Sequence, residues 1–110
     1  MRQFDICRLR ANTRPIAEAE TTSRTAFIVI LQADLNSDLD TRVVAPLVAE
    51  DVLPAIGRLR PTIHHAGRDY RLLSDRLSVL NAKSIGARVG SCADREYDIR
   101  RSLDIVFVGV

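Results

Sequence analysis

The sequence predicts a mostly β protein of the α+β class, in which an antiparallel sheet or small barrel carries one C-terminal helix. Short segments of β type follow one another along the chain, without the crossover helices that a parallel sheet requires. Residues 91–110 differ, because their apolar side chains recur at the spacing of one helix face. These side chains are Ile99, Leu103, Val106, Phe107 and Val110. Strands first and a single helix last favour a helix packed on an antiparallel sheet.

The strands are expected from alternation and from runs of β-branched residues. Residues 2–10 alternate polar and apolar side chains, as a strand does. Residues 25–33 form a nearly continuous apolar run, which predicts a central strand covered on both faces. Pro46 is expected to end the next strand and to begin a helical turn over 46–53. Shorter strands are expected at 41–45, 60–66, 68–73, 76–80 and 83–89, with a hairpin turn at Gly67 and loops at 11–23 and 34–40.

The C-terminal helix is expected to begin at Ser91, which opens a pattern resembling a capping box. Its end is unusual, since residues 107–110 place apolar side chains at a terminus that is normally frayed and wet. Phe107 can complete the core or a dimer interface, whereas Val108 falls off the main apolar stripe. The chain end is therefore expected to dock on its own core, on a second copy or on a target protein.

Size and composition predict one cytoplasmic domain that covers residues 1–110. No apolar stretch approaches the roughly 20 residues that span a bilayer, and no signal-peptide pattern opens the chain, so no membrane partner is expected. The net charge is +2 and Lys83 is the only lysine. Basic and acidic residues are interspersed, which argues against a dedicated nucleic-acid surface. Cys7 and Cys92 are expected to be reduced and buried.

No metal site and no cofactor are expected. The aspartates of the predicted turn lack the glycine and the closing glutamate of a calcium loop, so turn capping explains Asp34, Asp38 and Asp40. His64 and His65 are adjacent on a predicted strand and point to opposite faces, so they cannot ligate one metal together. No phosphate-binding glycine loop and no Ser/His/Asp arrangement is recognisable.

An ordered set of segments resembles the CcdB toxins of type II toxin–antitoxin modules. The set covers almost the whole chain except residues 15–23, which look like an insertion. Its members are Gln3-Phe4, Phe27–Leu35, Thr41–Leu47, Pro61–His64, Tyr70–Leu73, Ser84–Gly86, Arg95–Ile99 and Phe107–Val110. No segment is diagnostic alone, and the order and spacing carry the resemblance.

The resemblance implies a small SH3-like barrel with a C-terminal helix, shared with the MazF and PemK toxins. It implies a cytoplasmic homodimer that binds the A subunit of DNA gyrase and traps the enzyme on cleaved DNA. Such a protein acts by protein–protein contact, so the resemblance predicts that it is not an enzyme. A CcdA-like antitoxin is the expected second partner, and DNA is contacted only indirectly, through the antitoxin complex.

The gyrase-contacting positions of the family map onto two regions. The first region is the chain end with one helix position, namely Phe107, Val108, Gly109, Val110 and Arg101. The second is the loop after the central strand, namely Ala33, Leu35 and Asn36. The family pattern has tryptophan where this chain has Val108 and a small amide where it has Arg101. Valine offers no ring face to a gyrase arginine, a stacking contact worth up to about 2 kcal/mol.

Two alternatives remain open at this point. The related MazF and PemK toxins cut RNA with an arginine and a threonine or serine near the scissile phosphate. Arg42, Arg68 and Arg71 beside Thr41 or Ser74 are the residues that such chemistry would use here. A shared fold does not transfer a function. The other alternative is a non-toxic relative that only binds an antitoxin.

Overall fold

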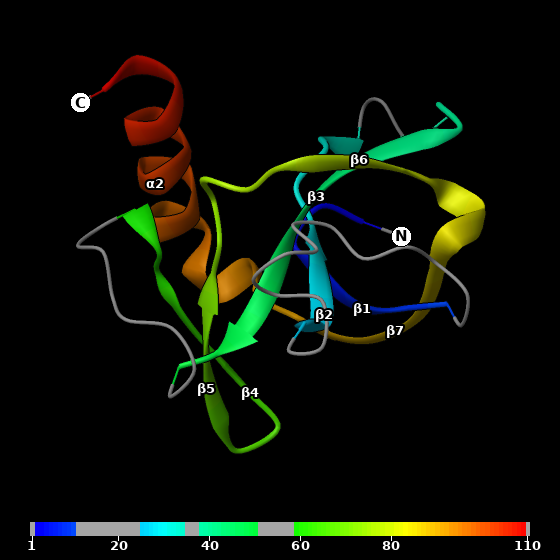
Figure 1. Ribbon diagram of the computed structural model, residues 1–110, viewed down its shortest axis with the longest axis horizontal. Helices are drawn as coiled ribbons and strands as arrows, with labels where there is room; N and C mark the ends of the chain where they lie inside the picture. The colour runs from blue at the N-terminus through cyan, green and yellow to red at the C-terminus, as the bar shows by residue number, and fades with distance from the viewer. Residues whose placement is uncertain (1, 11–24, 35–37, 51–58, 110) are drawn as a thin grey trace.

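The computed structural model describes residues 2–10, 25–34, 38–50 and 59–109 as one curled antiparallel sheet with a helix at its end (Figure 1). The sheet has the strand order β4-β5-β3-β2-β1-β7, and β6 also pairs with β3. The strands are β1 (Asp5–Leu9), β2 (Thr25–Ile30), β3 (Thr41–Ala49), β4 (Thr62–His65), β5 (Arg68–Leu72), β6 (Ser78–Asn81) and β7 (Ile85–Ser91). Helix α2 spans Glu96–Val108. The predicted fold class is confirmed.

Strand β2 lies at the centre of the sheet, and its side chains supply both halves of the core. Phe27 and Val29 belong to the larger cluster, on the face that Ile99 of α2 covers. Ile28 and Ile30 belong to a second cluster on the opposite face. The apolar run that predicted a strand covered on both faces is therefore explained by these two clusters.

Strand β3 corrects one prediction, because it continues through Pro46 to Ala49. Its first half pairs with β6 from Thr41 to Val44, and its last residues pair with β5 from Leu47. Pro46 falls between these two pairings, where β3 changes its partner and a missing N–H interrupts neither ladder. The predicted helical turn over 46–53 is wrong for residues 46–49, and residues 51–53 lie outside the described part of the chain. The predicted loop at 11–23 also lies outside it.

The hairpin between β4 and β5 is confirmed at the predicted place. His65 pairs with Arg68, so Ala66 and Gly67 form a two-residue loop. Both loop residues have positive φ, 51° for Ala66 and 79° for Gly67. Positive φ at both positions is the conformation that matches the twist of the two strands.

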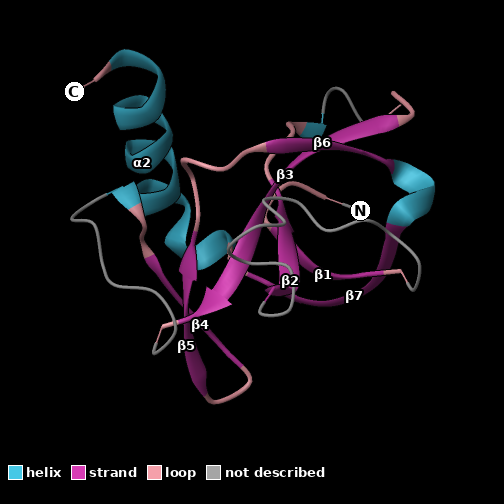
Figure 2. Ribbon diagram, in the orientation of Figure 1, coloured by secondary structure: helices cyan, strands magenta, loops and turns pink. Residues whose placement is uncertain are grey.

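Helix α2 begins later than the sequence predicts. Strand β7 continues to Ser91, and a 3₁₀ turn over Ala93–Arg95 precedes the helix (Figure 2). The Ser91 hydroxyl accepts a hydrogen bond from the amide of Ala93 at 3.2 Å, so it caps the 3₁₀ turn instead of the helix. The pairing of Ser91 with Asp5 on β1 keeps this residue in the sheet. The helix ends at Gly109, whose φ of 86° lies in the left-handed region that glycine favours.

The contrast between the two ends of α2 gives a test of the packing. Ile99 is fully buried, so Ile99→Ala is expected to lower the free energy of unfolding by about 2–5 kcal/mol. Val108 is 70% exposed on the same helix, and Val108→Ala is expected to change the free energy of unfolding by less than about 0.5 kcal/mol. Urea unfolding followed by circular dichroism measures both. Equal losses for the two variants would contradict this description of the helix.

Candidate functional site

The chain end presents apolar side chains to solvent. Phe107 is 71% exposed and Val108 is 70% exposed, at the last turn of α2. The amide of Gly109 donates to the carbonyls of Asp104 and Ile105, which closes the helix immediately after these two side chains. Val110 lies outside the described residues. Neither Phe107 nor Val108 completes the core of the subunit, so both are available to a second protein surface.

The first half of α2 holds the helix on the sheet. Ile99 and Ser102 are fully buried, and the Ser102 hydroxyl lies 2.7 Å from that of Ser74. The same hydroxyl also lies 2.7 Å from the carbonyl of Ile99. Beyond Leu103 no residue of the helix is buried. The last turn therefore projects beyond the sheet, as Figure 1 shows at the C-terminal end of the chain.

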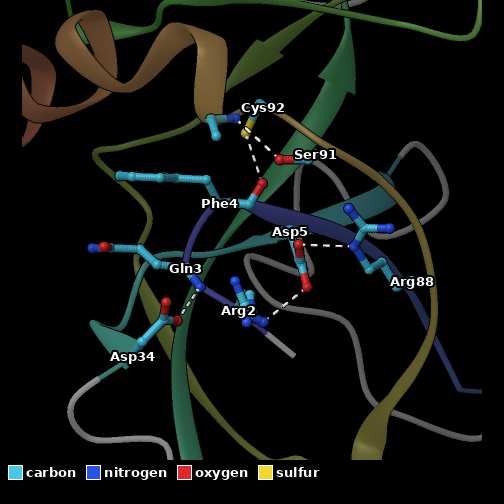
Figure 3. A network of polar contacts seen from close by, with 9 residues as sticks. Arg2, Gln3, Phe4, Asp5, Asp34, Arg88, Ser91 and Cys92 are labelled. Carbon is cyan, nitrogen blue, oxygen red and sulfur yellow. Dashed lines mark hydrogen bonds and ion pairs between the residues drawn. The ribbon is translucent and has the colours of Figure 1, made fainter.

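The chain next to the helix start is fixed by contacts with the N-terminal segment (Figure 3). The Phe4 carbonyl accepts hydrogen bonds from the amide of Cys92 at 2.9 Å and from its Sγ at 3.3 Å. Phe4 has φ of 69°, an uncommon conformation for a residue other than glycine. The buried carboxylate of Asp5 accepts hydrogen bonds from the Arg88 side chain at 2.9 Å and the Arg2 amide at 2.8 Å. These contacts tie the residues before α2 to β1.

Both thiols are free and buried, as the sequence predicts. Burial raises the pKa of Cys92 to about 12, and the charge of Asp94 adds to this effect. Burial and the charge of Asp5 also raise the pKa of Cys7. Each thiol is therefore protonated at neutral pH and is a poor nucleophile. The cysteines serve the packing of the two core clusters.

A cavity of about 400 Å³ lies between the start of β4, β5 and the first half of α2. We call it the arginine pocket, and its lining residues are Arg60, Pro61, Thr62, Arg71, Arg95, Tyr97, Asp98 and Arg101. Four of its eight lining residues are arginines, so its wall is rich in hydrogen-bond donors. The predicted contact residue Arg101 belongs to this pocket.

Three arginines of the pocket are held by carboxylates. Arg60 donates two hydrogen bonds to Asp75, at 3.1 and 3.0 Å, and its side chain is 7% exposed. Arg71 lies 3.5 Å from Glu50 and donates to the Thr62 hydroxyl at 2.7 Å.

The third of these contacts joins Arg95 to Asp98 at 2.8 Å. Among the residues that the structure describes, Arg101 has no carboxylate partner.

Only Ala33 of the second predicted contact region lies within the described residues. Ala33 is exposed, while Leu35 and Asn36 lie outside the described residues. The amide of Leu31 is hydrogen-bonded to the carbonyl of Val43, so the chain leaves β2 beside the start of β3. Figure 1 places the start of β3 and the end of α2 at opposite sides of the view.

The residues considered for RNA cleavage do not gather in one place. Ser74 is fully buried and bonded to Ser102, and Arg42 donates to the carbonyls of Leu39 and Thr41. Arg71 is paired with Val48, six residues beyond Arg42 on β3, which is about 20 Å along a strand. Arg68 lies at the other end of β5, next to the Tyr70 ring.

Two further predictions concern metals and membranes. Over the described ranges, no three His, Cys, Asp or Glu side chains come together as a metal site would require. His64 is exposed and lies 2.8 Å from Asp69, whereas His65 packs against Phe27. In the same ranges no helix has the length and apolar character needed to cross a membrane.

Sequence reasoning missed most of the arginine pocket. The sequence predicts no role for Arg60 or Arg95, and it places Arg101 only among the gyrase contacts. The three come together because β4 begins beside the first turns of α2, a tertiary contact that no local pattern encodes. The i, i+3 spacing of Arg95 and Asp98 was the one available signal.

Several solved structures with a similar fold are named as toxins or as endoribonucleases. An endoribonuclease from a mycobacterial species, in complex with its cognate antitoxin, matches with a TM-score of 0.71 and 9% identity, over 96% of this chain and 93% of that chain. The Mycobacterium tuberculosis toxin MazF-mt6 matches with a TM-score of 0.70 and 13% identity, over 94% of this chain and 95% of that chain. MazF from Deinococcus radiodurans matches with a TM-score of 0.70 and 18% identity, over 100% of this chain and 97% of that chain. A curled sheet with one C-terminal helix is thus the architecture of a class of toxins from toxin–antitoxin modules.

Within that class, the family is settled by the sequence itself. The family model described as CcdB protein matches residues 15–109, and the chain belongs to the CcdB family. The predicted resemblance is therefore confirmed. The match includes residues 15–23, which the sequence analysis took for an insertion.

The prediction that the protein is not an enzyme is wrong on this comparison. Chains that share its fold over nearly their full length are endoribonucleases. The prediction had rested on the resemblance alone, and the fold carries catalytic members as well as binding ones.

The Arg60–Asp75 pair predicts a pH dependence of stability. The hydrogen bond from Arg60 holds the pKa of Asp75 below its usual value. A lowered pKa in the folded state stabilises the protein above the unfolded pKa of about 3.9, and this contribution is lost as the pH falls through the folded value. Asp75→Asn is expected to lower the free energy of unfolding by about 1–3 kcal/mol at pH 7.

The difference between wild type and Asp75→Asn is expected to shrink as the pH falls from about 3.9 through the lowered folded-state pKa of Asp75, because the carboxyl then becomes uncharged, as the Asn side chain is. Urea unfolding at pH 7, 5 and 3 measures it. Asp69→Asn is the matched control, since Asp69 pairs with the exposed His64 and its side chain is 53% exposed. A difference for Asp75→Asn that is constant with pH would contradict the assignment.

Proposed function

We propose that this protein is the toxin of a type II toxin–antitoxin module and that it binds the A subunit of DNA gyrase through its C-terminal end. The observation that carries the proposal is the exposure of Phe107 and Val108 at the end of a helix that is otherwise held on the sheet. Membership of the CcdB family supports the same function. The gyrase–DNA cleavage complex is the species that the bound toxin traps.

The proposed assembly is a cytoplasmic homodimer. A two-fold axis doubles one contact surface, so two copies of Phe107 and Val108 meet a target with the same symmetry. A CcdA-like antitoxin neutralises the toxin, and DNA is reached only through that complex. Phe107, Val108, Gly109, Val110 and Arg101 form the proposed gyrase contact, together with Ala33, Leu35 and Asn36.

Burial of the exposed side chains supplies the affinity. Burying an apolar side chain such as Phe or Val contributes about 1.5–3 kcal/mol. Val108 provides apolar surface to bury, but it has no aromatic ring on which a guanidinium group could stack. Arg101 places a cation where relatives have a small amide, so the target must provide an acceptor there or leave the charge solvated.

A DNA-cleavage assay with purified gyrase tests this function. The wild-type protein is expected to accumulate linear DNA. The double variant Phe107→Ala/Val108→Ala is expected to need at least about tenfold more protein for the same effect, because the apolar contact is lost. Val108→Trp is expected to act at up to about thirtyfold lower concentration, since a ring face can add about 2 kcal/mol.

Val79→Ala is the matched control, because Val79 is also an exposed aliphatic residue, 60% accessible, on β6. It is expected to act like the wild type. Absence of linear DNA at saturating wild-type protein rules out gyrase poisoning. Growth arrest on expression separates a toxin from a relative that only binds antitoxin, and rescue by a substitution of the contact arginine in gyrase A identifies the target.

RNA cleavage is the second candidate function. Solved structures of the same fold are named as endoribonucleases, which favours it. Incubation of the protein with a defined single-stranded RNA tests it, and cleavage is expected to give products that carry a cyclic phosphate. Phe107→Ala/Val108→Ala should leave such cleavage unchanged, so the double variant separates the two activities. Intact RNA after incubation with excess protein excludes this candidate.

A further inference from the structure

The arginine pocket has hydrogen-bond donors that the described residues do not satisfy. Within the described part of the chain, Arg101 has no carboxylate partner, and the buried Nε atoms of Arg71 and Arg95 have no hydrogen-bond acceptor. A buried donor without a partner is destabilising, so such groups are rare in folded proteins. The carboxylates of Glu50 and Asp98 therefore do not saturate the guanidinium groups that they contact.

From the convergence of Arg71, Arg95 and Arg101 on one cavity, we propose that the arginine pocket binds the phosphate group of a small phosphorylated molecule. The site shares Arg101 with the proposed gyrase contact but does not include Phe107 or Val108. Guanidinium groups are planar forks that donate two parallel hydrogen bonds to phosphate oxygens. Several forks around one cavity can share the oxygens of one phosphate.

A phosphate monoester fits this site better than a carboxylate does. A ligand must compete with Asp98 for Arg95 and with Glu50 for Arg71, at contacts of 2.8 and 3.5 Å. A monocarboxylate offers the arginines the same two oxygens and single charge as these side chains. A phosphate monoester carries a charge of nearly −2 at neutral pH and has three terminal oxygens. It is therefore the anion that gains most from these donors.

The size and rim of the pocket indicate a ligand of nucleotide size. The volume of about 400 Å³ lies in the range of small-molecule sites. Tyr97 lines the same cavity and is 71% exposed, so one side of its ring is open to a ligand. An exposed aromatic ring beside a cationic site can stack on a base. Thr62 adds a hydroxyl, already oriented by Arg71 at 2.7 Å.

Isothermal titration calorimetry with the full chain tests the proposal, using inorganic phosphate and adenosine 5′-monophosphate as separate probes. Saturable binding with a Kd on the order of 0.1–1 mM is expected for the nucleotide at pH 7.5. Arg101→Gln and Arg95→Gln are each expected to weaken it at least about tenfold, since each removes a charge-assisted hydrogen bond. Binding is expected to weaken at pH 5, where the monoester loses its second charge.

Arg100→Gln is the matched control, because Arg100 is the neighbouring residue of the same helix, pairs with Glu96 and does not line the pocket. It is expected to bind the nucleotide like the wild type, and circular dichroism verifies that each variant is folded. Equal weakening by Arg100→Gln, or no saturable heat for either probe up to about 10 mM, overturns the site.

The two probes separate the sources of the phosphate. Tighter binding of the nucleotide, lost in Tyr97→Ala, assigns the site to a nucleoside phosphate. Equal affinity for both probes, unaffected by Tyr97→Ala, assigns it to the free anion. Neither result depends on gyrase, so failure of the cleavage assay and failure of this site are distinguishable.

Discussion

The attachment of α2 through its first half is the constraint on which the functional arrangement depends. Ile99 is buried against the larger core cluster, and the Ser102 and Ser74 hydroxyls form a buried hydrogen bond at 2.7 Å. A buried hydroxyl without a partner costs free energy, so this pair fixes the helix on the sheet. The residues beyond Leu103 have no comparable burial. The same attachment places the first turns of α2 beside β4, which forms the arginine pocket, and leaves Phe107 and Val108 exposed.

Much of this fold could be predicted from the sequence, where local pattern and burial agree. The run from Phe27 to Ile30 is apolar because β2 is covered on both faces, and Gly67 marks a turn that needs positive φ. Prediction failed where a tertiary contact overrides a local signal. Pro46 normally ends a strand, but here β3 changes partners at that residue. Ser91 has the chemistry of a helix cap, yet its pairing with Asp5 keeps it in β7.

The candidate site was predictable only in part, for the same reason. The apolar end of the helix is visible in the sequence, but its exposure is not, because Phe107 on the apolar stripe is as exposed as Val108 off it. The arginine pocket joins residues 60–62, 71 and 95–101, and no periodicity relates such distant segments. The charges of Arg95 and Arg101 look like those of any solvated helix face until β4 lies beside them. Their function depends on topology and not on local composition.

The two departures from the family pattern lie on one face of α2. Arg101 follows Tyr97 by four residues, and Val108 follows Arg101 by seven. At 100° per residue, these spacings place the three side chains within about 40° around the helix axis. Arg101 and Val108 are separated by a rise of about 10 Å. A partner that meets Val108 on this face therefore also meets a cation, and it meets an aliphatic side chain where relatives present an indole ring. In the proposed gyrase contact, apolar burial and an acceptor for Arg101 replace the stacking that the family pattern implies, so the chemistry of this proposed contact changes while its position on the helix is kept.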